Sequence, residues 1–136
     1  MKLVKDLWIL KSSGIVLFHR VYHERVDPNL FGALMSALNA YASELADGGL
    51  SSFELHNQRY TFMKKDDFIF IANSSRKVKE KRILSELEEI SKKFFDSYPN
   101  DFFEKWNGEV SVFSNFEHQI EPSLAEISER FREAFW

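Results

Sequence analysis

The sequence predicts an α+β fold, in which a five-stranded antiparallel sheet carries one helix on one face and two helices on the other. Along the 136 residues, apolar spacing indicates the order strand-strand-helix-strand-strand-strand-helix-helix. Two of the strand runs, Leu7 to Leu10 and Phe68 to Ala72, show no polar alternation, which is typical of strands covered on both faces. We therefore expect these two strands in the middle of the sheet.

The chain opens with a predicted hairpin. Val, Ile, Leu, Phe, Trp and Tyr dominate positions 3 to 11 and 15 to 23. Between these strands, Ser12, Ser13 and Gly14 supply a tight turn, in which glycine can adopt a positive φ.

A helix is expected over residues 28 to 46. Asp27 can accept hydrogen bonds from the first backbone N–H groups, and Pro28 has the φ of a first helical residue. Gly48 and Gly49 end the run. Its apolar stripe consists of Phe31, Leu34, Met35, Leu38, Tyr41, Ala42 and Leu45.

A three-stranded meander follows. Residues 52 to 56 and 59 to 64 alternate between apolar and polar side chains, as expected of strands buried on one face. The last strand is the run from Phe68 to Ala72. Because the first and fifth strands are central, the second and third lie at opposite edges, which gives the order 2-1-5-4-3.

Two further helices are expected to cover the second face of the sheet. One spans about residues 76 to 98 and ends before Pro99. Residues 100 to 120 are expected to be irregular but packed. The last helix starts at Pro122 and Ser123.

Composition limits the class of protein. Hydrophobic residues make up 44% of the chain, which is enough for one core, so we expect a single domain over residues 1–136. Cysteine is absent, which excludes disulfides and thiolate metal sites. The net charge of -3 disfavours nucleic acid as a partner. Since no apolar run is long enough to span a membrane, we expect a soluble, cytoplasmic protein.

The sequence resembles the longin-like, or SNARE-like, domain family over roughly residues 3 to 98. The resemblance rests on the opening run from Leu7 to Phe18, the helix entry from Asp27 to Phe31, and the run from Asp67 to Ala72 before a long helix. It implies a domain without catalytic residues that scaffolds vesicle-trafficking assemblies or binds small GTPases, frequently as a dimer. A coiled-coil SNARE motif is absent, which disfavours a role as a fusion SNARE.

No catalytic, cofactor-binding or metal-binding constellation is expected. His19 and His23 would lie about 13 Å apart on a strand, too far to share one ion. His56 and His118 have no nearby ligand partner, and Asp66-Asp67 falls where a solvated turn is expected. Nucleotide-loop, zinc-protease and serine-hydrolase motifs are also absent.

A basic segment before the second long helix breaks a local rule, because cations are unfavourable at the positive end of a helix dipole. We weigh a solvated face against an anionic-lipid or acidic-partner site, which would imply peripheral membrane contact. Its cations are Arg76, Lys77, Lys79, Lys81 and Arg82.

The preferred candidate site is a dimer or partner interface. The second strand is apolar although it lies at an edge, where exposed strands are normally guarded. Small residues beside the stripe of the first helix would let another backbone approach, or would let this helix sit low on its own sheet. The candidate residues are Val16, Phe18, Arg20, Tyr22, Ala33, Ala37 and Ala40.

The sequence thus favours a non-enzymatic interaction module that dimerises and binds a small Ras-like GTPase or a trafficking-complex subunit. Whether the dimer has identical subunits stays open. The main alternative is a PAS-like sensory domain, which has the same strand order and would enclose a small ligand. An enzyme with an unrecognised site is the third class.

Overall fold

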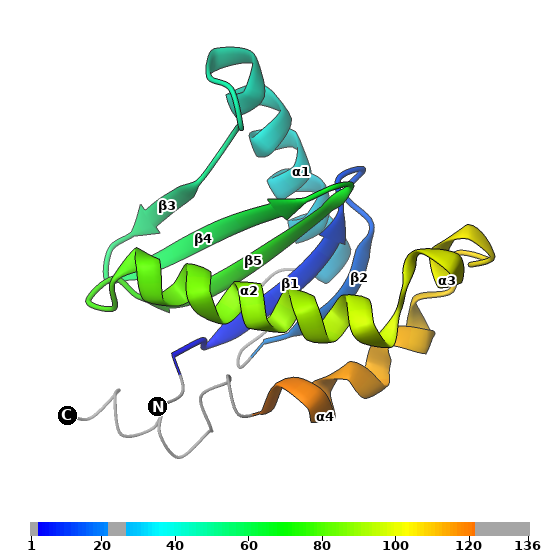
Figure 1. The fold of residues 1–136 in the computed structure, drawn as a ribbon. Coiled ribbons are helices and arrows are strands. Elements are labelled where there is room, and N and C mark those ends of the chain that lie inside the picture. The colour runs from blue at the N-terminus through cyan, green and yellow to red at the C-terminus, as the bar shows by residue number, and fades with distance from the viewer. Residues whose placement is uncertain (1–2, 22–26, 122–136) are drawn as a thin grey trace.

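The computed structural model describes residues 3–21 and 27–121 of the chain. Within them, five strands form one antiparallel sheet in the order β2-β1-β5-β4-β3, which confirms the predicted topology (Figure 1). Both runs without polar alternation are interior strands, with β5 in the centre and β1 beside it. The strands are β1 (Asp6–Lys11), β2 (Val16–Arg20), β3 (Ser52–Leu55), β4 (Gln58–Lys65) and β5 (Phe68–Ser75).

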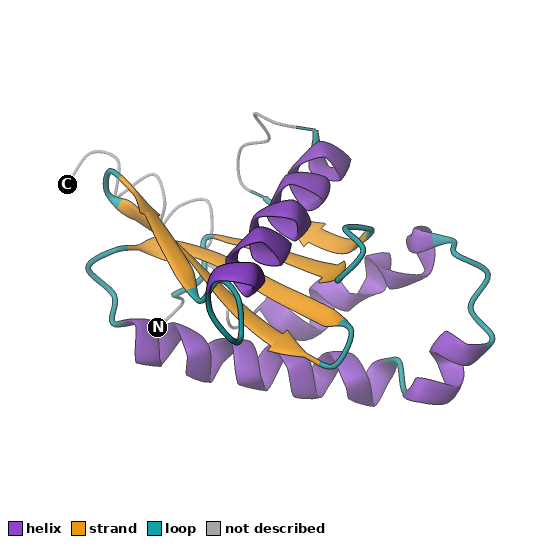
Figure 2. Cartoon of the chain, turned by 90° about the horizontal axis from the view of Figure 1, so that it is seen from above, coloured by secondary structure: helices purple, strands orange, loops and turns teal. Residues whose placement is uncertain are grey.

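Two long helices lie on opposite faces of this sheet (Figure 2). One is α1 (Pro28–Leu45), where the Asp27 carboxylate accepts hydrogen bonds from the N–H groups of Asn29 and Leu30. The other is α2 (Glu80–Ser97), which starts four residues later than expected because residues 76 to 79 form a loop.

Residues 100 to 120 are more regular than expected. They form the short helix α3 (Asn100–Glu104), the 3-10 helix η1 (Val110–Phe116) and the single turn α4 (Glu117–Ile120). The prediction that they pack was correct, since Phe113, Phe116 and Ile120 are fully buried. The last predicted helix lies outside the described residues.

The sheet separates two hydrophobic clusters. The cluster under α2 is the larger and contains Leu7, Ile9, Phe70, Ile83, Leu87, Ile90, Phe94, Phe113 and Phe116 among its buried side chains. The cluster under α1 is smaller and contains Trp8, Leu10, Val16, Met35, Phe62, Ile69 and Ile71. Successive side chains of β1 and β5 point to opposite faces of the sheet, so each strand contributes residues to both clusters.

An irregularity in β2 explains its unbroken apolar run. Ile9 pairs with Phe18, but its neighbour Leu10 pairs with Val16, so Leu17 is an extra residue in the edge strand. Such a bulge disturbs the strict alternation of side chains. As a result Leu17 and Phe18 both lie in the cluster under α2, while Val16 lies under α1.

Candidate interaction surface

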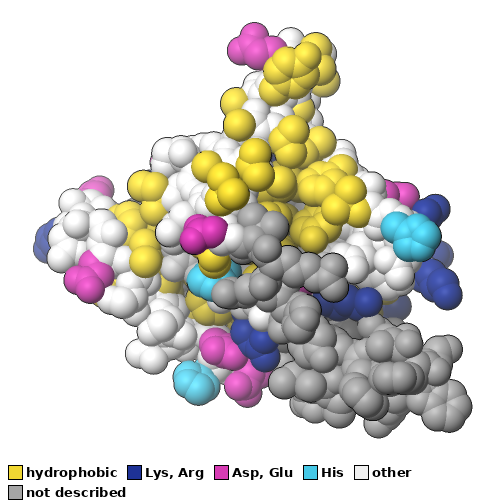
Figure 3. All heavy atoms as spheres, turned by 180° about the vertical axis from the view of Figure 1, so that it is seen from behind, with side chains coloured by type: hydrophobic (Ala, Val, Ile, Leu, Met, Phe, Trp, Pro, Cys, Tyr) yellow, Lys and Arg dark blue, Asp and Glu magenta, His cyan; other side chains and the backbone are white. Residues whose placement is uncertain are grey.

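The outer face of α1 is apolar and exposed. Figure 3 shows hydrophobic side chains gathered along this helix. At about 100° per residue, the large exposed hydrophobic side chains of α1 fall within an arc of about 80°. Gly32 and Met35, the two buried residues of the helix, lie outside this arc. The exposed fractions are 55% for Leu30, 49% for Leu34, 47% for Leu38, 68% for Tyr41 and 74% for Leu45. We call these five residues the α1 ridge.

The α1 ridge corrects the sequence analysis, which grouped four of its members into one stripe with Phe31, Met35 and Ala42. Only these last three are buried or half-buried. Helical spacing identifies an apolar face, but it does not tell whether the chain's own sheet or another surface covers it.

Next to the α1 ridge runs a lane of small residues, Ala33, Ala37 and Ala40, all of them exposed. They therefore do not seat the helix on its own sheet, which was the alternative explanation for them. Gly32 does so instead, because a Cβ there would lie 2.5 Å from the Gly14 carbonyl oxygen and from Val16 Cγ2.

Charge is nearly absent from this helix. Glu44 is the single charged residue between Pro28 and Leu45. A helix whose outer side stays in water normally carries charged and polar residues on that side. The outer side of α1 therefore has the composition of a surface that another apolar surface covers.

Contacts at both ends hold α1 against the sheet. Near its start, the Phe31 ring stacks on Trp8 with ring centroids 4.1 Å apart. In the middle of the helix, Ser36 Oγ donates to the Ser12 carbonyl at 2.5 Å. After its end, Lys64 Nζ donates to the carbonyls of Gly48 and Leu50 and to the Asn39 side chain. Partial burial lowers the pKa of Lys64.

The apolar β2 side chains of the predicted interface are buried, whereas the prediction was an exposed apolar edge strand. Val16 and Phe18 are only 5% and 6% exposed, and the Phe18 ring packs edge-on against Phe116 of η1. Arg20 forms an ion pair with Glu117 at 2.7 Å. These side chains are thus engaged within the chain, so a partner at this edge would meet mainly the β2 backbone. Tyr22 lies outside the described residues.

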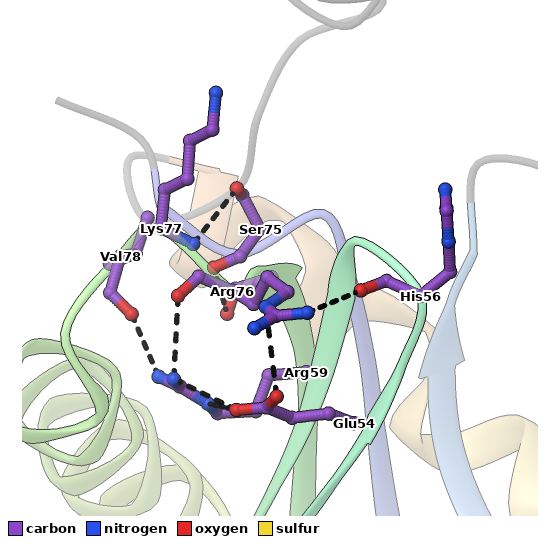
Figure 4. Close-up of polar contacts among 8 residues, drawn as sticks. Glu54, His56, Arg59, Ser75, Arg76, Lys77 and Val78 are labelled. Carbon is purple, nitrogen blue, oxygen red and sulfur yellow. Dashed lines mark hydrogen bonds and ion pairs between the residues drawn. The ribbon is translucent and has the colours of Figure 1, made fainter.

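The predicted basic segment comprises the loop after β5 and the first turn of α2. It lies near the β3-β4 turn, where Arg76 Nη1 donates to the His56 carbonyl. Arg59 Nη1 donates to the Val78 carbonyl at 2.8 Å, and Arg59 Nη2 donates to the Arg76 carbonyl at 3.3 Å (Figure 4). Glu54 pairs with Arg59 at 3.2 Å and with Arg76 at 3.6 Å.

The remaining candidates for chemistry lie apart from one another. Within the described residues, no three His, Asp or Glu side chains gather where they could hold a metal ion. Asp66 and Asp67 lie in the expected turn between β4 and β5. Asp67 accepts from Ser12 Oγ and pairs with Lys11 at 3.1 Å, and the hydrogen bonds from Ser12 and then Lys11 lower its pKa.

A buried polar group was missed by the sequence analysis. Asn73 Nδ2 donates to Asp6 Oδ2 at 2.8 Å and to Gln58 Oε1 at 3.0 Å. Burial, followed by the charge of Asp6, raises the pKa of the neighbouring Tyr60. The sequence offered one signal of this group, which is the acidic residue Asp6 directly before the apolar run of β1. The group spans β1, β5 and β4, which suits a structural role in aligning the sheet.

Comparison with known proteins identifies a related family and fold. A family model described as the first longin domain of FUZ, MON1 and HPS1 matches residues 5–95. A search of curated proteins gave no match. This family match favours the longin interpretation over the PAS-like alternative and supports a protein-interaction module. Among the described residues, no helix combines the length and the hydropathy needed to cross a membrane.

Two solved structures that align with TM-scores above 0.5 show the same fold. MglB from Myxococcus xanthus aligns with a TM-score of 0.53 and 10% identity over 69% of this chain and 85% of that chain. A chain from the mammalian SRP receptor aligns with a TM-score of 0.56 and 12% identity over 91% of this chain and 94% of that chain. A roadblock/LC7 domain from Streptomyces avermitilis has a TM-score of 0.44 and 15% identity over 54% and 68% of the two chains.

Proposed function

The chain belongs to the family of the first longin domains of FUZ, MON1 and HPS1, and we propose that it is a non-enzymatic interaction module that pairs with a second copy of itself through α1. The exposed α1 ridge carries this proposal. Apolar side chains exposed by between 47% and 74% on one helix lose contact with water when a second helix covers them, at about 25 cal/mol for each Å² removed.

The shape of the surface supports a second copy as the occupant. A two-fold axis brings the same patch of both subunits together, so the patch must be complementary to itself. The α1 ridge runs beside the alanine lane, and in an antiparallel pair the ridge of each helix can lie in the lane of the other. Since Glu44 is the only charge between Pro28 and Leu45, few like charges would oppose each other.

The edge position of β2 supports the same arrangement. β2 is a terminal strand of the sheet, and backbone groups on the outer side of such a strand can pair with another strand. With the Val16 and Phe18 side chains buried inward, a neighbouring β2 would bind backbone to backbone. In the proposed dimer the two sheets continue across the axis while the two α1 helices pack beside it.

Light scattering on the purified full chain tests the pairing. We expect a dimer at tens of micromolar for the wild type and a monomer for Leu38→Glu, which places a charge in the α1 ridge. The matched control is Leu84→Glu, because Leu84 is also an exposed leucine, 38% accessible, but lies on α2. A monomeric wild type, or equal dissociation by the two variants, would contradict the proposal.

The family supports a further part of the proposed function, the binding of a small Ras-like GTPase or a trafficking-complex subunit by the paired domain. Capture from lysates loaded with GDP or with a non-hydrolysable GTP analogue tests this part. We expect a Ras-like GTPase to be retained in one nucleotide state by the wild type and by Leu84→Glu, and to be lost with Leu38→Glu. Equal retention in both states would argue against nucleotide-dependent binding.

A further inference from the structure

We propose that the basic tip of the molecule, formed by Lys77, Lys79, Lys81 and Arg82, binds an anionic lipid surface. All four side chains are exposed, and they gather at one end of a chain whose net charge is -3. The local charge therefore has the opposite sign to that of the whole molecule. This inference uses no property of α1 and stands apart from the proposed pairing.

These four cations lack carboxylate partners within the described residues, whereas the fifth, Arg76, has one. Arg76 Nε lies 3.6 Å from Glu54 Oε2, and Arg76 Nη1 donates to the His56 carbonyl at 2.9 Å. Glu54 is also paired with Arg59. Glu54 is thus occupied by the two arginines. Glu80 lies within the segment itself, but within the described residues no ion pair joins it to the four cations of the basic tip.

The backbone that carries the basic tip is fixed by protein contacts. Arg59 donates to the carbonyls of Arg76 and Val78, and the Lys77 N–H donates to Ser75 Oγ at 3.2 Å. Figure 4 shows the Lys77 side chain extending away from this cluster. The loop is therefore held in place while its lysine reaches outward.

The chemistry of the basic tip fits lipid better than a folded protein. Lysine is depleted in the cores of protein interfaces, where aromatic and other apolar residues supply the contact. Here Val78 is only half-exposed and Ile83 is buried, and the nearest exposed apolar side chain, Leu84, is only 38% accessible, so charge rather than apolar surface dominates the tip. Clusters of four or more Lys and Arg near a membrane are attracted to the negative surface potential of anionic lipids without needing a shaped pocket.

The start of α2 adds to the positive field. Lys79 is the N-cap residue and its side chain makes no capping hydrogen bond, so backbone N–H groups of the first turn lack a side-chain acceptor. Lys81 and Arg82 follow within that turn, where cations oppose the helix dipole and only Glu80 offsets them. An anionic surface would relieve this unfavourable arrangement.

Vesicle co-sedimentation of the full chain tests the proposal. We expect the wild type to sediment at low salt with vesicles of equal parts phosphatidylcholine and phosphatidylserine, to be released by raised salt, and not to sediment with phosphatidylcholine alone. Loss of Lys77 and Lys81 should weaken partitioning about 30-fold, equivalent to about 1 kcal/mol for each cation near the surface. The variant Lys77→Glu/Lys81→Glu should therefore show at least this loss.

The matched control is Lys92→Glu/Lys105→Glu, which changes the net charge equally at two exposed lysines away from the basic tip. We expect this control to retain most of the wild-type binding. Equal losses in the two variants, or no sedimentation of the wild type with the anionic vesicles, would overturn the proposal. Retention of the wild type on immobilised polyglutamate without any vesicle binding would assign the basic tip to an acidic protein and would likewise overturn it.

Discussion

The two long helices have the same length and opposite relations to the core. Each contains 18 residues. On α2, Ile83, Leu87, Ile90 and Phe94 have no exposed surface, so its apolar face is used within the chain. On α1 only Gly32 and Met35 are buried, and the α1 ridge is exposed. We infer that α2 stabilises the fold, whereas much of α1 is apolar surface left for a partner.

Amphipathic spacing in a helix therefore has two structural outcomes. Both helices place apolar residues at intervals of three and four positions, and both pack on the sheet. Below α2 the cluster is extended by η1 and α4, whereas α1 meets the sheet through Gly32, Phe31 and Met35. The same periodicity therefore yields a core face in one helix and an exposed face in the other.

The largest expected effect that tests this comparison is on the α2 side. Phe94 is fully buried, and its ring contacts Phe68, Phe70 and Phe116. We expect Phe94→Ala to lower the free energy of unfolding by about 3–5 kcal/mol, because a cavity replaces the ring. Denaturant unfolding followed by circular dichroism measures this loss. A cost below about 1 kcal/mol would mean that α2 is not the stabilising helix.

A smaller loss is expected where α1 touches the sheet. Gly32→Ala places a methyl group 2.5 Å from the Gly14 carbonyl oxygen and from Val16 Cγ2, so α1 must move outward. We expect the free energy of unfolding to fall by about 1–3 kcal/mol, as for other overpacked sites. Ala40→Ser on the exposed lane is the control in the same unfolding experiment. If both variants unfold alike, α1 does not lie as close to the sheet as described.

The polar link between the two hairpin turns should contribute less. Hydrogen bonds from Ser12 and then Lys11 lower the pKa of Asp67 in the folded state, so its contribution is present above the unfolded pKa of about 4 and disappears as the pH falls through the folded-state pKa. Because the Asp67 side chain is 61% exposed, we expect Asp67→Asn to cost below about 1 kcal/mol at neutral pH.

Unfolding of the wild type and Asp67→Asn across acidic pH measures this dependence. The two curves should converge at low pH, where Asp67 is protonated in both the folded and the unfolded states. A difference that persists unchanged at low pH would show that the carboxylate charge is not responsible.

The smallest effect on folding is expected from the α1 ridge. Leu34→Gln/Leu45→Gln removes apolar side chains that are already 49% and 74% exposed, so we expect the monomer to keep its free energy of unfolding within about 0.5 kcal/mol. Self-association, measured by sedimentation velocity, should weaken. A large loss of stability at protein concentrations too low for pairing would place these leucines in the chain's own core. The two helices would then not differ in their relation to the core.

The sheet could be predicted from local pattern for a physical reason. Strands covered on both faces need apolar residues at successive positions, and β1 and β5 satisfy this need with Leu7 to Leu10 and Phe68 to Ala72. A tight turn needs glycine or a similar residue, and Gly14 adopts a φ of 103° there. Both requirements act within a few residues, so they are visible in the sequence.

The exposure of the candidate interface residues was predicted only in part. Ala33, Ala37 and Ala40 are exposed as a partner interface requires, but Val16 and Phe18 turned out to be buried. The bulge at Leu17 and the contact of Phe18 with Phe116 account for this outcome. A contact across about a hundred residues leaves no local signal, so the sequence could not show what covers the apolar edge.

The strand order, the two long helices and the basic segment after β5 could be predicted from the amino-acid sequence, because periodicity, turn residues and charge are local properties. The tertiary structure alone decided which apolar residues are buried. Burial depends on which surfaces meet. The chain itself covers the apolar side chains of α2 and of Val16, Leu17 and Phe18 in β2, but leaves the α1 ridge in contact with water.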